Sequence, residues 1–270
     1  MACFPRLVTT IVRYLTFVTV MTGCGFVSPP QSPPEVIPPA TTPPAAEPCR
    51  TDEPGVVLCV DFEDRPLMNQ AVDRSPKAAN ATAVEVGTMM RTPGEQAAVL
   101  TDRSSLTLPE ASKLDLATFT IEMWIWPNFS TLKYKDHDAG LFHNYGQYAM
   151  RIQDDRRIIC GLLGDQRVTS DQAVPLREWS HVTCRYAQGE MSVYLNGKLS
   201  GASSISSIPL LDLFGSAIGS ELRRTPTLTA EVVDRFIGGI DNVRIYDRAL
   251  DPDRICLAAG HTSPAECQEE

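Results

Sequence analysis

Apolar and polar side chains alternate in many short stretches of this chain, and no long helical periodicity is present. Within residues 118–126, four large apolar side chains recur at every second position: Phe119, Ile121, Met123 and Ile125. Because successive side chains of a strand point to opposite faces of a sheet, this spacing predicts a strand with one core face. Similar stretches, bounded by Gly, Pro, Asp or Asn, occur at residues 55–63, 148–153, 157–164, 180–186, 191–197 and 236–246. The pattern predicts an all-β fold.

The opposite face of the strand over residues 118–126 carries Thr120, Glu122, Trp124 and Trp126. Two tryptophans make this face partly apolar, so it is either covered by loops or part of a binding surface. Of these alternatives, we favour packing beneath loops.

Residues 180–197 predict two successive tight reversals. Ala187–Glu190 is a turn between two apolar stretches, and Asn196-Gly197 supplies the positive φ angles of a second turn. His181 and Cys184 are three residues apart on one strand and therefore point to opposite faces. We expect them to be architectural rather than a metal site or a nucleophilic pair.

The character of the sequence changes near residue 251. Asp251 is a good N-cap, Pro252 suits the first helical position, and Gly260 can end a short helix. Many strands and one terminal helix predict a two-sheet antiparallel sandwich of the jelly-roll type with one short C-terminal helix.

The amino terminus predicts export from the cytoplasm. Arg6 and Arg13 precede a short apolar run that is too brief to span a bilayer, so residues 1–23 are expected to be a signal peptide. The sequence Met21-Thr22-Gly23-Cys24 resembles the lipobox of bacterial lipoproteins, although Met21 replaces the usual leucine. The resemblance implies cleavage before Cys24 and acylation of that cysteine. An ordinary signal peptide is the alternative, with Cys24 lost or left over.

Residues 24–48 predict an extended linker. Nine prolines lie between Ser28 and Pro48, with few large apolar side chains, so this segment is expected to adopt polyproline II. The remaining residues 49–270 are expected to form one domain. Gly25 is not the aspartate that retains many lipoproteins at the inner membrane, which favours lipid anchoring at the outer membrane.

Charge and cysteine content narrow the function and the compartment. The chain has 24 basic and 33 acidic residues and no basic stripe, which argues against a nucleic-acid partner. Six of the eight cysteines lie in the domain, as expected for disulfides in an oxidising compartment. Several pairings are open in principle, and proximity in sequence and in hairpins favours the following: Cys49 with Cys59, Cys160 with Cys184, and Cys256 with Cys267.

Three spans together resemble a known family: FTIEMWIWP at residues 119–127, REWSHVTCRYAQGEMSVYLNGKL at 177–199 and GGIDNVRIYDRALDPDRI at 238–255. They are similar to the concanavalin A-like, laminin G-like jelly-roll superfamily, and the similarity extends over nearly all of residues 49–259. The resemblance implies binding of glycans, proteins or other surface ligands.

Some members of the family hold calcium. Asp73 and Asp241 stand where such members place ligands, and Glu63 or Asp64 can join them. Calcium needs about six to eight oxygens, which no single segment supplies, so a site would be assembled from distant segments. Alternatively, Asp73 starts a turn and Asp241 binds backbone groups.

A stretch at residues 128–148 mixes aromatic and polar side chains that suit a sugar or protein surface. Its candidate ligand-binding residues, expected in and around one loop, are Tyr134, His137, Asp138, His143 and Tyr145. The sequence lacks the carboxylates spaced two and four residues apart that related glycosidases place on one strand. We therefore expect a non-catalytic, surface-anchored binding module for a glycan or an extracellular or envelope protein. The alternatives are a structural or accessory module of an envelope complex and, less favoured, a polysaccharide-degrading enzyme.

Overall fold

The computed structural model describes residues 6–12, 15–21, 43–50, 52–64, 69–76, 78–109, 112–129, 138–162, 166–206 and 214–268. The chain divides into two units, Met1–Ala40 and Thr41–Glu270. In the first unit, β1 (Arg6–Val12) pairs antiparallel with β2 (Leu15–Met21). No helix in the described ranges has the length and apolarity needed to cross a membrane. Cys24 lies outside the described residues, so its lipidation stays a prediction.

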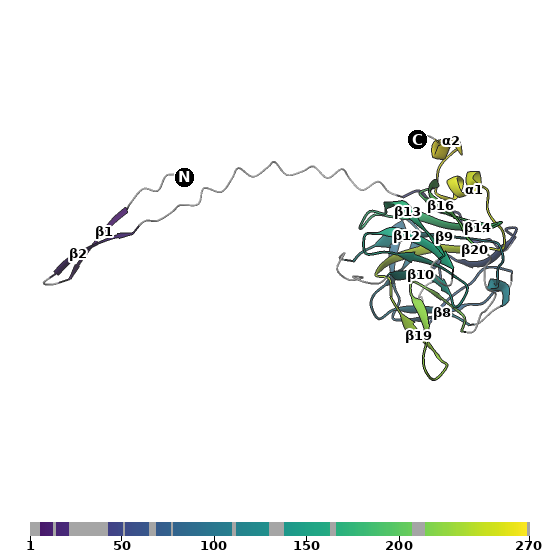
Figure 1. The fold of residues 1–270 in the computed structure, drawn as a ribbon, viewed down its shortest axis with the longest axis horizontal. Helices are drawn as coiled ribbons and strands as arrows, with labels where there is room; N and C mark the ends of the chain where they lie inside the picture. The colour runs from purple at the N-terminus through teal and green to yellow at the C-terminus, as the bar shows by residue number, and fades with distance from the viewer. Residues whose placement is uncertain are drawn as a thin grey trace. The chain divides into compact units, whose positions relative to one another are not determined.

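The second unit is a sandwich of two antiparallel sheets (Figure 1). The first sheet has the strand order β13 (Arg167–Ala173), β12 (Arg157–Leu162), β11 (Tyr148–Ile152), β10 (Ala139–Asn144), β17 (Ser216–Ile218), β8 (Ser105–Leu108), β5 (Ala81–Val84) and β4 (Gln70–Ala71). The second sheet has the order β16 (Lys198–Ser204), β15 (Glu190–Leu195), β14 (Ser180–Ala187), β9 (Phe119–Pro127), β20 (Gly238–Tyr246), β7 (Glu95–Leu100) and β6 (Gly87–Thr92). In addition, β3 (Val56–Val60) pairs with the second half of β20.

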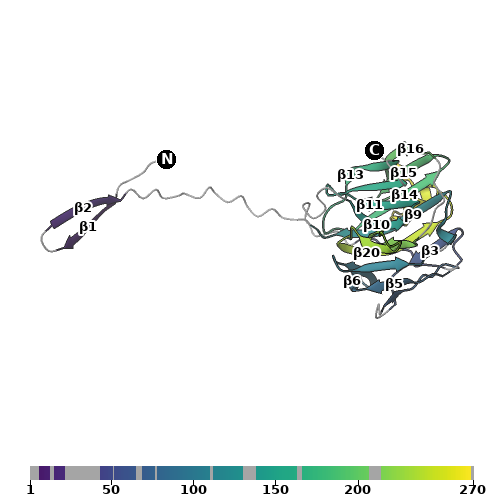
Figure 2. The same cartoon turned by 60° about the horizontal axis from the view of Figure 1, so that its bottom comes forward.

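The core lies between the two sheets, which Figure 2 shows from a second direction. The expected core face of β9 is confirmed, because Phe119, Ile121, Met123 and Ile125 are buried in it. The ring of Phe119 stacks on Tyr148 of the first sheet at 4.3 Å. Alternation along β9 therefore determines which side chains join the sheets.

Three disulfides are present in the pairing that the sequence favours: Cys49–Cys59, Cys160–Cys184 and Cys256–Cys267. Cys160 lies on β12 of the first sheet and Cys184 on β14 of the second, so their bond joins the two layers. The other two bonds staple short segments near the ends of the domain.

The predicted reversals and terminal helix are confirmed. β14, β15 and β16 form a meander with consecutive antiparallel pairing. Helix α1 (Pro252–Ala258) follows the N-cap Asp251, whose side chain makes no capping hydrogen bond. The structure adds helix α2 (Ala265–Gln268) and a 3₁₀ turn, η1 (Ser112–Leu114), which the sequence did not predict.

The single loop expected over residues 128–148 is wrong in its second half. Residues 139–144 form β10, and a tight turn at Gly146 leads into β11. A separate hairpin of β18 (Glu221–Arg224) and β19 (Ala230–Val233) lies further along the chain. The glycine of Tyr145-Gly146-Gln147 is a local turn signal that marks this reversal in the sequence.

Candidate binding cavity and its surroundings

The candidate ligand-binding residues of the 128–148 stretch are not gathered at one place. Tyr134 and His137 lie outside the described residues. Asp138 immediately precedes β10 and Tyr145 immediately follows it, so they lie at opposite ends of this strand. At about 3.3 Å per residue, they are roughly 20 Å apart along the backbone. Whether any of these residues contacts a ligand stays a prediction.

His143 is part of the packed structure. It is buried, and its Nδ1 accepts a hydrogen bond from the backbone N–H of Leu222 at 2.8 Å. Burial, together with the charge of Arg151, lowers the pKa of His143 to about 3, so the ring is neutral at physiological pH. Tyr145 packs edge-on against His143 and Phe214. The contacts of His143 and Tyr145 therefore anchor the end of β10 to the segments of Leu222 and Phe214.

His181 and Cys184 lie on opposite faces of β14, as expected from their spacing. Cys184 is in the core, bonded to Cys160, whereas His181 packs against Trp124 on the outer face of the second sheet. Trp124 is also buried, with the Arg91 guanidinium 4.9 Å from its ring centroid. The packing expected of Trp124 and Trp126 is confirmed for Trp124, whereas Trp126 is only half-buried.

Asp73 is a buried counter-ion and turn residue. Its Oδ1 accepts hydrogen bonds from the backbone N–H groups of Cys59 and Ser75, and its Oδ2 pairs with Lys113. Burial acts to raise the pKa of this carboxyl, but Lys113 and three backbone N–H groups outweigh it and hold the pKa below the usual range. Both oxygens are thus surrounded by donors.

Asp241 forms a buried ion pair with Arg91. Arg91 donates to its Oδ2 at 2.7 Å, and both side chains are fully buried. Burial raises the pKa of Asp241 to about 7, and Arg91 acts in the opposite direction.

At both carboxylates, N–H donors and a cationic side chain occupy oxygens that a calcium ion would need. Among the described residues, neither Asp73 nor Asp241 belongs to a cluster of three metal-ligating side chains. A calcium site at these positions stays a prediction of the sequence.

The outer face of the second sheet carries a buried charge network. Glu122 on β9 lies directly between Thr183 of β14 and Arg244 of β20 in the strand register. The Glu122 carboxylate is 3.6 Å from Arg244 and accepts a hydrogen bond from the Tyr246 hydroxyl at 3.2 Å. Burial raises the pKa of Glu122, while the charges of Arg244 and Arg254 oppose the rise.

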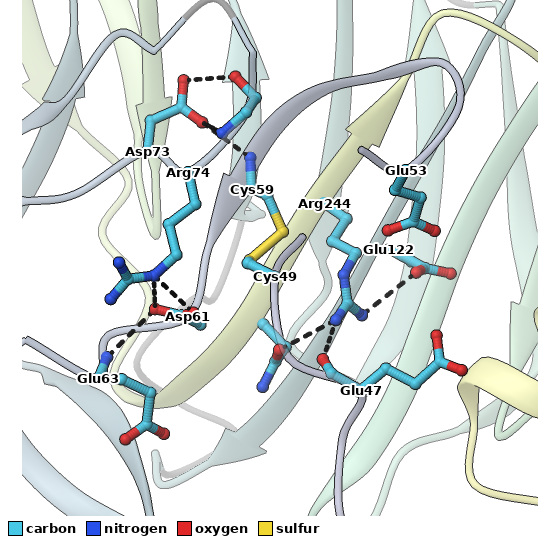
Figure 3. The surroundings of a disulfide bond; sticks show 12 residues. Glu47, Cys49, Glu53, Cys59, Asp61, Glu63, Asp73, Arg74, Glu122 and Arg244 are labelled. Atoms are coloured by element: carbon cyan, nitrogen blue, oxygen red, sulfur yellow. Dashed lines mark hydrogen bonds and ion pairs between the residues drawn. A yellow bond between two sulfur atoms is a disulfide. The ribbon is translucent and has the colours of Figure 1, made fainter. Parts of the chain in front are cut away.

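A segment that we call the N-terminal strap, residues 43–50, covers part of this face (Figure 3). Arg91 donates to the carbonyl oxygen of Pro44 at 2.8 Å, and Arg244 donates to that of Glu47. The Glu47 carboxylate pairs with Arg254 of α1 at 2.7 Å. The strap and α1 therefore screen Glu122 from solvent.

A cavity of about 770 Å³ lies where the edges of the two sheets meet beside the C-terminal segment. Its lining residues come from the end of β13, the start of β14, the β15–β16 turn and the tail after α1: Gln172, Ala173, Val174, Pro175, Ser180, Leu195, Asn196, Lys198, Leu199, Ser200, His261, Cys267 and Gln268. This volume is within the usual range for small-molecule sites.

The cavity lining combines polar and apolar side chains. The hydroxyls of Ser180 and Ser200 are buried and have no hydrogen-bond partner in the described part of the chain. Beside them, Leu199 is 60% exposed. None of the described residues that line it carries a carboxylate. No local sequence pattern predicts this cavity, because its walls come from segments of both sheets and from the tail.

The fold and this edge cavity define a jelly-roll domain of the concanavalin A-like class. A family profile described as "Concanavalin A-like lectin/glucanases superfamily" matches residues 100–256. The match covers more than half of the chain, which therefore belongs to this superfamily. A search of curated protein sequences gives no significant match.

Solved structures agree on the fold. Domain 4 of AbnA, a GH43 extracellular arabinanase from Geobacillus stearothermophilus, has a TM-score of 0.58 at 18% identity, covering 76% of this chain and 98% of that one. The binding domain of Paraclostridial Mosquitocidal Protein 1 gives 0.57 at 16% identity, covering 76% and 52%. The Botulinum Neurotoxin Type G receptor binding domain gives 0.56 at 14%, covering 76% and 51%. This chain thus spans about half the length of the two toxin chains.

Proposed function

We propose that this domain is a non-catalytic binding module that holds a saccharide in the cavity between β13 and the β15–β16 turn. The observation that carries the proposal is the lining of this cavity: the exposed polar side chains of Gln172, Asn196 and Lys198 next to the exposed apolar side chain of Leu199. Sugar rings present hydroxyls at their edges and C–H groups on their faces. Polar groups that fix orientation beside an apolar wall therefore suit them.

The similar structures support this class of ligand. Domain 4 of AbnA was solved in complex with arabinotriose, and the toxin domains are described as binding domains. An arabinanase and a sialidase are also among the proteins that contain this fold, so the fold alone does not separate binding from catalysis.

The positions of the carboxylates favour binding without catalysis. Glycoside hydrolysis typically uses two carboxyl groups that flank the scissile bond. The described lining of the 770 Å³ cavity has none, and that of a second cavity, of about 440 Å³, has a single carboxylate, Glu190. Glu122 and Asp241 are buried against arginines and do not line either cavity.

We further propose that the module acts outside the cytoplasm on a lipid anchor at Cys24, with its ligand a glycan of the cell surface or surroundings. Residues 28–48 as polyproline II would hold the domain about 65 Å from the anchor, at roughly 3 Å per residue. Multiple acyl chains give stable membrane attachment without a spanning helix.

A glycan array probed with the purified protein tests the function. We expect binding to a restricted set of saccharides, weakened at least tenfold by Leu199→Ala. The matched control is Leu228→Ala, because Leu228 is 58% exposed but lies in the β18–β19 hairpin. Absence of any array signal would favour the structural or accessory role, and release of reducing ends from the bound saccharide would establish an enzyme.

A further inference from the structure

The C-terminal tail brings two sulfurs and an imidazole together. One ligand atom each from Cys256, His261 and Cys267 lie within 4.8 Å of one another. Cys256 is on α1, Cys267 is on α2, and His261 lies in the segment between them. Among the described residues, this is the one cluster of three or more metal-ligating side chains. In the structure the two sulfurs form a disulfide.

A backbone carbonyl oxygen holds one ring nitrogen of His261. Its Nε2 lies 2.9 Å from the carbonyl oxygen of Asn196, which can only accept, so Nε2 carries a hydrogen. Metal-ligating histidines typically donate their second ring N–H in this way, which fixes the tautomer and the ring plane.

The other ring nitrogen faces a negative charge. In the neutral ring Nδ1 carries a lone pair, and it lies 3.3 Å from the Glu266 carboxylate. A metal ion bound at Nδ1 would therefore lie close to the negative charge of Glu266, which favours a cation there. The Glu266 carboxylate is held in place by the backbone N–H groups of Thr262 and Ser263.

The cluster is reachable from solvent. His261 and Cys267 line the 770 Å³ cavity, which gives a reductant and an ion a route to the sulfurs. By contrast, the Cys160–Cys184 bond is buried in the core. All three side chains come from a segment of twelve residues, 256–267, so binding a metal requires only local adjustment.

We propose that Cys256, His261 and Cys267 form a zinc(II) site when the disulfide between the two cysteines is reduced. A dithiol transfers two electrons and two protons to the Cys256–Cys267 bond, giving two thiols, and is itself oxidised to a disulfide. Zinc displaces the two thiol protons and binds two thiolate sulfurs and Nδ1 of His261. Two thiolates and one imidazole are a common zinc ligand set, with the fourth position open to water. The segment from Cys256 to Cys267 is thus cross-linked either by a disulfide or by a zinc ion.

The experiment uses cobalt(II) as a spectroscopic probe and zinc(II) as the competing ion. The protein is reduced with dithiothreitol, freed of it without air, and titrated with cobalt. We expect a thiolate-to-cobalt charge-transfer band that saturates at one equivalent and disappears on addition of zinc. The oxidised protein should give no such band.

Variants separate this site from the other cysteines. Cys256→Ser/Cys267→Ser should abolish the band, whereas Cys49→Ser/Cys59→Ser, which removes a different disulfide, should keep it. His261→Gln retains all cysteines and, in the reduced protein, should weaken zinc affinity at least tenfold. The oxidised form of this variant shows whether the fold is intact. Reduced protein that gives no band, a band that persists in Cys256→Ser/Cys267→Ser, or zinc affinity unchanged by His261→Gln would overturn the proposal.

Discussion

At the scale of single residues, the outer face of the second sheet depends on charges that have no access to water. Arg91 and Asp241 pair at 2.7 Å with both side chains fully buried, although they are 150 residues apart in sequence. A buried ion pair is weak evidence of net stabilisation, but removal of one partner leaves an uncompensated charge. The sequence suggested Asp241 as a candidate calcium ligand, but its partner Arg91 could not be inferred from local spacing.

Arg91→Met should therefore lower the free energy of unfolding by about 3–5 kcal/mol, because Asp241 loses its cation in a buried environment. Urea denaturation at pH 7 measures the change. Arg223→Met is the control: Arg223 pairs with Glu231, and its side chain is 64% exposed. Its loss should cost less than about 1 kcal/mol. Equal losses in the two variants would show that the buried pair has no special role.

His143 predicts how stability changes with pH. Its pKa is about 3 in the folded protein, against about 6.5 in an unfolded chain. As the pH falls below 6.5, the unfolded state takes up a proton that the folded state does not, so this contribution to stability is lost between pH 6.5 and 3. His143→Gln cannot titrate. Relative to this variant, the native protein should lose about 1.4 kcal/mol per pH unit below pH 6, measured by denaturation at pH 7, 6 and 5. Parallel curves for the two proteins would contradict the account.

At the scale of strands and turns, the sequence pattern predicted β3, β9, β11, β12, β14, β15 and β20, but not β4 to β8, β10, β13 or β17 to β19. The core face of β9, the opposite faces of His181 and Cys184, and the β14–β15–β16 meander all follow from period-two geometry. The prediction failed at β10, where all six residues Ala139–Asn144 are buried and no alternation exists to be recognised. Helix α2 was missed because four residues carry no periodic signal.

The β15–β16 turn offers a test at this scale. Gly197 has φ of +80°, and a Cβ there would lie 2.8 Å from Cys267 Sγ and 2.9 Å from Cys256 Cα. Gly197→Ala should destabilise the protein by about 2–4 kcal/mol, combining the left-handed backbone penalty with overpacking. Gly94 has φ of +96° and nothing within 4 Å of such a Cβ. Gly94→Ala should therefore cost only about 1 kcal/mol. Chemical denaturation of both variants measures the difference. Similar losses in the free energy of unfolding would show that the C-terminal tail moves aside for the added methyl group.

At the scale of the whole molecule, the sequence predicted the architecture and the disulfide framework but not the cavity. Cys160–Cys184 joins the sheets, and its partners were inferred from hairpin proximity. The cavity needs the relative placement of β13, the β15–β16 turn and the tail, which no local pattern contains. Ser180 and Ser200 carried no signal in sequence, because only their burial without partners singles them out.

The anchoring proposal also belongs to this scale. In a bacterial host fed an alkyne-labelled fatty acid, the protein should incorporate the label, and Cys24→Ser should not. Cys3 lies within the expected signal peptide, so Cys3→Ser should keep the label. Unlabelled native protein recovered from the medium would instead favour an ordinary signal peptide.

The central claim, binding of a saccharide at the edge cavity without catalysis, is tested most directly by a crystal structure of the protein with the saccharide that gives the strongest array signal. The account predicts an intact saccharide beside Leu199, with its hydroxyls hydrogen-bonded to the polar side chains of the lining, Gln172, Asn196 and Lys198. A saccharide bound away from this cavity, or one cleaved at a glycosidic bond, would contradict it.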